Sequence, residues 1–157
     1  MALGFERYDV VVVGASTSGL YAAEALARSG RNVAVVERKA KHDTPGRSWI
    51  VTPEIKRFLP DLPASAILHR TGVIEMHAGS ACQRVALRDP DLVVERTALM
   101  RYLRSRADAA GVVVLEGFDV CGLEPTEAGL VVRCQGRSAG DVRPLLARDV
   151  LGADGVA

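Results

Sequence analysis

The 157-residue sequence has few cysteines, few aromatic residues and almost no net charge. Cys82, Cys121 and Cys134 form no CxxC pair, and the three histidines show no ligand spacing with them. We therefore expect no disulfide framework and no metal site, and instead buried or half-buried thiols in a reducing compartment. Twenty basic residues balance nineteen acidic ones, which gives no support for a nucleic acid partner or an anionic membrane.

Long apolar runs are also lacking. No run approaches the roughly 18 residues that span a bilayer, and charges lie where a signal peptide would be apolar. We expect a cytoplasmic protein without a membrane span. The composition, 48% hydrophobic and 25% charged, is typical of a globular domain and excludes a disordered chain. We therefore treat residues 1–157 as one domain.

A strand, helix and strand unit opens the chain. Residues 8–13 (YDVVVV) are apolar and β-branched, which is typical of a strand buried on both faces of a parallel sheet. Residues 20–29 are rich in helix formers and end at Gly30, and residues 32–36 (NVAVV) predict a second strand. Such a unit of about 30 residues is a right-handed βαβ crossover.

The rest of the chain predicts shorter elements. We expect a strand at 48–52, a helix from Pro53 to about Phe58, strands at 73–77 and 82–87, a break at 88–91 and a strand at 92–95. A clear helix covers 97–110, and a third buried strand follows at 112–115. Residues 118–124, 130–134 and 145–151 predict a small β-meander. The fold class is therefore α/β, a Rossmann-like domain with a parallel sheet and a meander.

The turn after the first strand carries the pattern Gly14-x-Ser16-x-x-Gly19. In this context Gly14 allows a tight turn and Gly19 allows helix and strand to pack closely. The free N–H groups of the helix N-terminus favour phosphate oxygens. Ser16 stands where a third glycine is usual, and we expect its hydroxyl to donate to the phosphate.

Glu37 ends the second strand, 23 residues after Gly14. A carboxylate there accepts hydrogen bonds from the 2′- and 3′-hydroxyls of a ribose, and it would repel a 2′-phosphate. This favours FAD or NAD over NADP, although Arg38 and Lys39 follow directly. A third motif, Gly152-Ala-Asp154-Gly155, follows the last strand and is by itself only a turn.

Three collinear stretches carry a resemblance to a known family: residues 8–38, residues 95–117 and the run DVLGADG at 149–155. Together they resemble the FAD-binding N-terminal part of the flavoprotein superfamily of p-hydroxybenzoate hydroxylase and the geranylgeranyl reductases. Residues 48–92 match poorly and would begin the variable substrate-side insertion. The serine and arginine that usually follow the aspartate–glycine motif would lie beyond Ala157, so the resemblance implies that a C-terminal part is missing.

The resemblance also implies roles for single residues. The loop would hold the FAD pyrophosphate, Glu37 with Arg38 would lie at the adenosine ribose, Arg47 would reach the pyrophosphate, and Arg96 would contact the flavin on its ribityl side. The backbone of Val120 would meet the adenine, and Asp154 matches a motif linked to FAD and nicotinamide nucleotide binding. The loop residues concerned are Gly14, Ala15, Ser16, Thr17, Ser18 and Gly19.

The implied function is an FAD-dependent oxidoreductase with a nicotinamide electron donor and a small organic substrate. It would either reduce an isoprenoid double bond or hydroxylate an organic, for example aromatic, substrate, and the arginine-led helix slightly favours the reductases. No catalytic side chain is assigned, because the flavin carries the redox chemistry in such enzymes. Two alternatives stay open: an NAD-dependent dehydrogenase domain and a non-catalytic nucleotide-binding fragment. The sequence does not give the oligomeric state.

Overall fold

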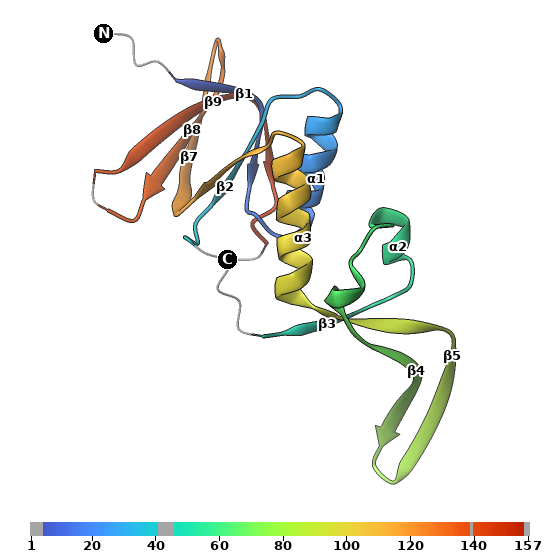
Figure 1. Ribbon diagram of the computed structural model, residues 1–157. Helices are drawn as coiled ribbons and strands as arrows, with labels where there is room; N and C mark the ends of the chain where they lie inside the picture. Colours follow the sequence, from blue (N-terminus) through green and yellow to red (C-terminus); the bar gives the residue numbers. More distant parts are fainter. Residues whose placement is uncertain (1–4, 41–45, 139, 156–157) are drawn as a thin grey trace. The chain divides into compact units, whose positions relative to one another are not determined.

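The computed structural model describes residues 5–40, 46–138 and 140–155, and these divide into two compact units (Figure 1). The first unit comprises residues 1–42 and 103–157, and the second comprises residues 43–102. Helix α3, Arg96–Ala109, begins in the second unit and ends in the first.

A six-stranded sheet in the order β6-β2-β1-β9-β8-β7 forms the first unit. Strands β6, β2, β1 and β9 run parallel, whereas β8 and β7 are antiparallel to their neighbours. The predicted meander is therefore continuous with the parallel sheet through β9, which pairs with both β1 and β8. The elements of this unit are β1 Glu6–Val13, α1 Thr17–Arg28, β2 Val33–Glu37, β6 Val113–Glu116, β7 Phe118–Thr126, β8 Gly129–Gly136 and β9 Val142–Gly152.

Both faces of β1 and β2 are buried, as their continuous apolar sequences predict. On one face Val11, Ala34 and Val36 pack with Val132 and other residues of the meander strands. Because side chains alternate along a strand, Val10, Val12, Val33 and Val35 point to the opposite face. Helix α1 contacts both strands, and its Leu20 and Ala23 are also buried. The carboxyl ends of β1 and β2 are thereby held rigidly side by side.

Helix α1 is tied to the C-terminal half of α3 by a buried carboxylate. Glu24 is 2% exposed, and Arg106 Nε donates to both of its oxygens at 2.8–2.9 Å. The exposed Arg28, one turn further along α1, donates to the same carboxylate at 2.8 Å. Two guanidinium groups therefore compensate the cost of burying Glu24.

The second unit contains a three-stranded antiparallel sheet in the order β3-β5-β4. Its elements are β3 Ser48–Val51, α2 Ile55–Phe58, the 3₁₀ turn η1 Ala64–Ala66, β4 Ile67–Ala78 and β5 Ala81–Glu95. Strands β4 and β5 form a long hairpin around a two-residue turn, in which Gly79 has φ +59°. This left-handed conformation suits glycine and is typical of tight hairpin turns.

The outer part of this hairpin has two different faces. Glu75, His77 and their partners Arg84 and Cys82 lie on one face, because residues directly opposite each other share a face. The other face carries Ile74 and Met76 of β4 and Val85 of β5, with exposed fractions of 42%, 55% and 38%. The hairpin is therefore polar on one side and apolar on the other.

The break predicted at residues 88–91 is wrong, because β5 runs through this stretch. Pro90 is tolerated because the register with β4 shifts there, between the pairs Thr71–Asp91 and Val73–Ala86. A proline removes no ladder hydrogen bond at such an irregularity.

Other boundaries also differ from the prediction. Helix α1 begins at Thr17 rather than at Leu20, because Ser16 caps it. Strand β4 begins at Ile67, six residues earlier than expected. The strand predicted as buried at 112–115 is the sheet edge β6, and its Val113 is 39% exposed.

The three cysteines are free thiols in different surroundings. Cys134 is buried, and burial raises the pKa of its thiol to about 11. Cys82 and Cys121 are exposed, which corrects the expectation that all three are buried or half-buried. Among the residues with described positions, no helix is both long and apolar enough to cross a membrane.

Candidate functional site

The turn between β1 and α1 is closed so tightly that two of its positions accept only glycine. Gly14 has φ +99°, and a Cβ on it would lie 2.7 Å from the Ala153 carbonyl oxygen. A Cβ on Gly19 would overlap the Gly14 carbonyl oxygen. The two glycines thus provide the tight turn and the close helix approach that their spacing predicts.

The Ser16 hydroxyl uses all of its hydrogen-bonding capacity inside the protein. It donates to the Ala153 carbonyl oxygen at 3.0 Å and accepts from the Gly19 amide at 3.3 Å. A hydroxyl has one proton to donate, so the 2.9 Å contact with Ser18 Oγ is donated by Ser18. Ser16 thus caps α1 and joins the turn to the segment after β9. Donation of its hydroxyl to a phosphate stays a prediction.

Consecutive backbone amides of the turn are nevertheless free to bind an anion. The Gly14 amide donates to the Val36 carbonyl oxygen, and the Ala15 amide donates to the Glu37 carboxylate. Within the described part of the chain, the amides of the next three residues, 16–18, have no acceptor. They lie at the N-terminus of α1, where the helix dipole favours negative charge, and the first turn holds no acidic residue.

Glu37 lies at the carboxyl end of β2, half-buried and directly beside this turn. Its Oε2 accepts from the Ala15 amide at 2.8 Å, and its Oε1 accepts from the Lys39 amide at 2.9 Å. A carboxylate has about four acceptor positions, so one remains on each oxygen. Glu37 therefore orders the turn and keeps capacity for two further donors, such as a pair of vicinal hydroxyls.

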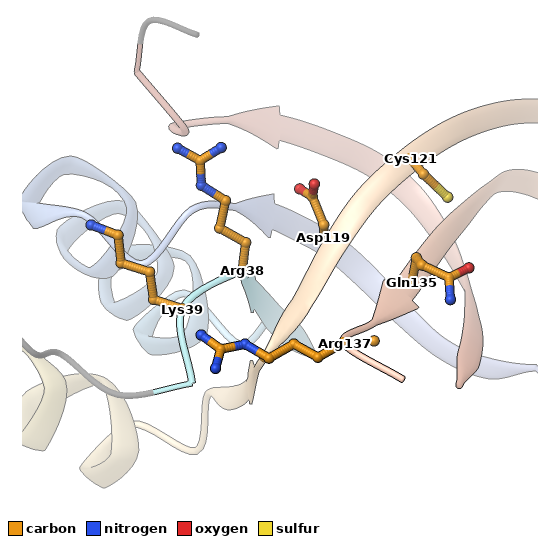
Figure 2. Close-up of a pocket in the computed structure, with 8 residues that line it drawn as sticks. Arg38, Lys39, Asp119, Cys121, Gln135 and Arg137 are labelled. Carbon is orange, nitrogen blue, oxygen red and sulfur yellow. The ribbon is translucent and has the colours of Figure 1, made fainter. Parts of the chain in front are cut away.

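A groove of about 500 Å³ lies beside the segment that directly follows β2 (Figure 2). The side chains of Arg38 and Lys39 line the groove from the segment after β2, and that of Asp119 lines it from β7. The groove is joined to Glu37 through the backbone, because the Gly117 amide donates to the Glu37 carbonyl oxygen at 2.7 Å. Its lining residues are Arg38, Lys39, Gly117, Asp119, Cys121, Gln135, Gly136 and Arg137.

Val120 lies on β7 between two residues of this groove, but its side chain packs against the core cluster. Asp119 and Cys121 present their side chains to the groove instead, because side chains alternate along the strand. The side chains at 119, 121, 135 and 137 were not singled out from the sequence. The sequence feature that predicts two of them is the alternation of side chains along a strand, which places residues 119 and 121 on the face opposite Val120.

The turn after β9 adjoins the glycine turn through Ala153, whose amide donates to the Val13 carbonyl oxygen at 2.8 Å. Asp154 follows it and is exposed. Its carboxylate forms no hydrogen bond or ion pair with any other residue whose position is described. Two motifs that are far apart in the sequence, at 14–19 and 152–155, are therefore neighbours in the fold.

Arg47 and Arg96 belong to the second unit, where the Arg96 amide donates to the Arg47 carbonyl oxygen at 3.0 Å. The Arg96 guanidinium lies over the Trp49 ring, 5.0 Å from its centre. Its buried Nε has no hydrogen-bond partner in the described structure. Glu95, the residue before Arg96, caps α3 by accepting hydrogen bonds from the Thr97 and Ala98 amides. These hydrogen bonds, that of Thr97 first, lower the pKa of Glu95.

Of the three histidines, His42 lies outside the described residues, whereas His69 and His77 are exposed on β4. Neither described histidine lines the groove. Among the described residues, the carboxylates at the turn and the groove are those of Glu37, Asp119 and Asp154, and Lys39 and Cys121 also line the groove. No catalytic side chain is assigned.

Comparisons with known proteins agree with this geometry. Residues 7–157 match the family model described as FAD binding domain. The chloroplastic geranylgeranyl diphosphate reductase of Oryza sativa subsp. japonica is 30% identical over 162 residues, which cover 95% of this chain and 35% of the relative.

Solved structures share the fold. A geranylgeranyl bacteriochlorophyll reductase-like protein from Thermoplasma acidophilum superposes with a TM-score of 0.80 at 20% identity, covering 97% of this chain and 40% of its own. The p-nitrophenol 4-monooxygenase of Pseudomonas putida DLL-E4 gives a TM-score of 0.79 at 18% identity, covering 96% and 42%. The chain thus spans well under half the length of these proteins.

Proposed function

The chain belongs to the FAD-binding domain family, and from this premise we propose that the site just described holds the adenosine diphosphate half of FAD. The free amides of residues 16–18 would bind the pyrophosphate at the N-terminus of α1. Glu37 would accept the two ribose hydroxyls on its remaining positions, and the groove beside it would receive the adenine. The observation that carries the proposal is the row of unpaired amides at residues 16–18 next to the Glu37 carboxylate, each oxygen of which accepts only one hydrogen bond from the described residues.

The residues present fit this cofactor. A Cβ on Gly14 or Gly19 would clash with the backbone of the turn, so the two glycines permit the tight turn in which the amides of residues 16–18 have no acceptor among the described residues. Asp154 has an unpaired carboxylate on the adjoining turn, and we propose that it binds a cofactor hydroxyl. In the second unit, the unpaired Nε of Arg96 is available for a cofactor acceptor, with Arg47 as its backbone neighbour.

We propose that the whole protein is an FAD-dependent oxidoreductase that reduces an isoprenoid-type double bond with a nicotinamide nucleotide as electron donor. When bound, the flavin supplies the hydride chemistry, while the chain binds and orients the cofactor. The name of the rice relative supports the reductase branch, because it is 30% identical to this chain. Hydroxylation of an organic substrate ranks second, because the monooxygenase shares the fold at only 18% identity.

The two alternatives fare differently. The family match to an FAD-binding domain disfavours an NAD-dependent dehydrogenase. The antiparallel strands β7 and β8 that follow β6 disfavour it too, because such a dehydrogenase would continue with alternating helices and strands. A non-catalytic nucleotide-binding role would require FAD or ADP binding without flavin turnover.

We also propose that residues 48–92 form the beginning of the substrate-side part. The hairpin in this segment presents Ile74, Met76 and Val85 on one exposed face. Such apolar side chains suit contacts with a further apolar surface better than contacts with water.

Titration of the cofactor-free chain with FAD, followed by flavin fluorescence, tests the proposed site. We expect ADP to compete with FAD, because the amides of residues 16–18, Glu37 and the groove are all proposed to contact that half of the cofactor. We expect Glu37→Ala to weaken FAD binding at least tenfold, about 1.4 kcal/mol or more.

Glu127→Ala is the matched control, because Glu127 is an exposed carboxylate in the β7–β8 turn. Glu37→Gln distinguishes a loss of binding from a loss of folding, because it keeps the size of the side chain and one oxygen acceptor. Its circular dichroism spectrum should equal that of the parent. The proposal fails if ADP does not compete, or if Glu37→Ala binds FAD as tightly as Glu127→Ala does.

A further inference from the structure

The polar face of the β4–β5 hairpin gathers three side chains of metal-ligand type. A carboxylate oxygen of Glu75, an imidazole nitrogen of His77 and the thiol sulfur of Cys82 all lie within 4.8 Å of one another. This set could not be predicted from the sequence, because the spacing of the cysteines and histidines matches no metal-binding pattern. The hairpin brings the set together: His77 and Cys82 are cross-strand partners, and Glu75 lies two residues before His77 on the same face.

The distances are close to those of a tetrahedral zinc site. Ligand bonds of about 2.3 Å to sulfur and about 2.0–2.2 Å to nitrogen or oxygen place a tetrahedral S–N pair about 3.6 Å apart and an N–O pair about 3.4 Å apart. Cys82 Sγ lies 3.7 Å from His77 Nε2, and His77 Nε2 lies 3.6 Å from Glu75 Oε2. Small side-chain rotations on an exposed face would therefore complete the geometry.

The neighbouring Arg84 is compatible with a cation at this position. Its guanidinium holds Glu75 Oε1 at 2.7–2.8 Å, which leaves Oε2 facing His77. A carboxylate that binds a metal through one oxygen is commonly hydrogen-bonded through the other. With a side chain that is 73% exposed, Arg84 also has room to move away from an incoming ion.

The tight turn gives the site a rigid frame. The hairpin register is continuous from Glu75–Arg84 through His77–Cys82 to Ala78–Ala81, so the backbone fixes the three side chains on one face. The ligands are exposed, with 63% of the His77 side chain and 42% of the Glu75 side chain accessible, so an ion and a water molecule can reach them.

We propose that Glu75, His77 and Cys82 bind one divalent transition-metal ion of the zinc type, with water as the fourth ligand. The mixed thiolate, imidazole and carboxylate set favours zinc over magnesium or calcium, which prefer oxygen ligands alone. None of these three residues is among those proposed to bind FAD, and the metal site does not depend on the proposed function.

Metal titration of the full 157-residue chain tests this proposal, after removal of bound metal with a chelator. We expect one Zn²⁺ per chain in competition with a chromophoric chelator. We also expect a thiolate-to-cobalt charge-transfer band when Co²⁺ replaces zinc. Binding should weaken as the pH falls, because His77 and Cys82 must lose their protons to bind the metal.

The sulfur ligand and the nitrogen ligand each have a matched control. Cys82→Ser and His77→Ala should each weaken zinc binding at least tenfold. Cys121→Ser and His69→Ala should leave it unchanged, since these residues are also exposed but lie outside the cluster. Unchanged far-ultraviolet circular dichroism excludes unfolding of any variant. The proposal is overturned if the chain binds no zinc, if the cobalt form lacks the sulfur band, or if Cys82→Ser binds zinc like Cys121→Ser.

Discussion

Ser16 shows how one side chain joins two distant motifs. Its hydroxyl connects the start of α1 to the Ala153 carbonyl oxygen, 137 residues away in the sequence. Where a third glycine is usual, this chain therefore has a serine whose hydrogen bond connects two turns.

Replacing Ser16 by alanine should both destabilise the chain and weaken FAD binding. Loss of the helix cap alone costs about 1 kcal/mol, and the unpaired Ala153 carbonyl oxygen adds to that. We expect a fall of about 1–2 kcal/mol in the free energy of unfolding, measured by urea denaturation. Ser18→Ala removes only the donor to Ser16 Oγ and should cost less than half as much. Equal effects of the two variants would contradict the role assigned to Ser16.

Individual residues were predicted best where their chemistry acts through the backbone. The close approach at Gly14 and Gly19 followed from their spacing and from the strand before them. The position of Glu37 at the strand end was also correct, but its hydrogen bonds to the Ala15 and Lys39 amides were not foreseen. The hydrogen bond from Ser16 to Ala153 could not be predicted, because its acceptor lies in the turn after β9, 137 residues later.

At the scale of the elements, the β1–α1–β2 unit depends on two kinds of glycine. Gly30 has φ +85°, with nothing within 4 Å of an added Cβ. Gly19 is different, because an added Cβ would meet the Gly14 carbonyl oxygen. One position requires only backbone freedom, whereas the other requires that a side chain be absent.

The two glycines should respond differently to alanine. We expect Gly30→Ala to cost about 1–2 kcal/mol, the strain of a left-handed residue, and to leave FAD binding intact. Gly19→Ala should cost about 3 kcal/mol or more and abolish FAD binding, because the N-terminus of α1 must move away from β1. Urea unfolding and flavin fluorescence measure the two effects. FAD binding by Gly19→Ala at the parental level would refute the close packing described for this turn.

Secondary structure was predicted well where the apolar pattern was continuous and poorly where pairing overrode local signals. The strands at 8–13 and 32–36 matched β1 and β2 closely. The proline at position 90 predicted a break, but the register shift beside it lets β5 continue. Likewise, the polar residues His69 and Arg70 interrupt the apolar pattern, so the first part of β4 was not predicted from the sequence. It forms a strand because it pairs with β5.

At the scale of the whole molecule, the core between the parallel strands and the meander contains one weak acid, the buried Cys134, and packs against a second, the half-buried Tyr8. Burial, followed by the hydrogen bond to Glu6, raises the pKa of Tyr8 to about 12, and burial raises that of Cys134 to about 11. Both side chains belong to, or pack against, the same core cluster. The folded chain therefore keeps protons that the unfolded chain loses at lower pH.

The chain should lose stability at alkaline pH. A raised pKa in the folded state means that unfolding releases protons above about pH 9, so the free energy of unfolding falls as pH rises towards 12. Between pH 8 and pH 10.5 we expect a loss of about 2 kcal/mol in urea denaturation. Cys134→Ala should flatten this slope, whereas Cys82→Ala, at an exposed cysteine of the second unit, should not. A slope that Cys134→Ala leaves unchanged would show that Cys134 does not cause it.

The position of β9 between β1 and β8 has a consequence for synthesis of the chain. Glu6 pairs with Leu145, so β1 waits for its second neighbour until nearly the whole described chain has left the ribosome. Until then one edge of β1, with the apolar run of residues 10–13, stays open to other strands. The early βαβ unit forms from local contacts, whereas closure of the sheet is a late, long-range event. Nascent chains stalled before residue 145 should therefore be the forms that chaperones bind and that aggregate most readily.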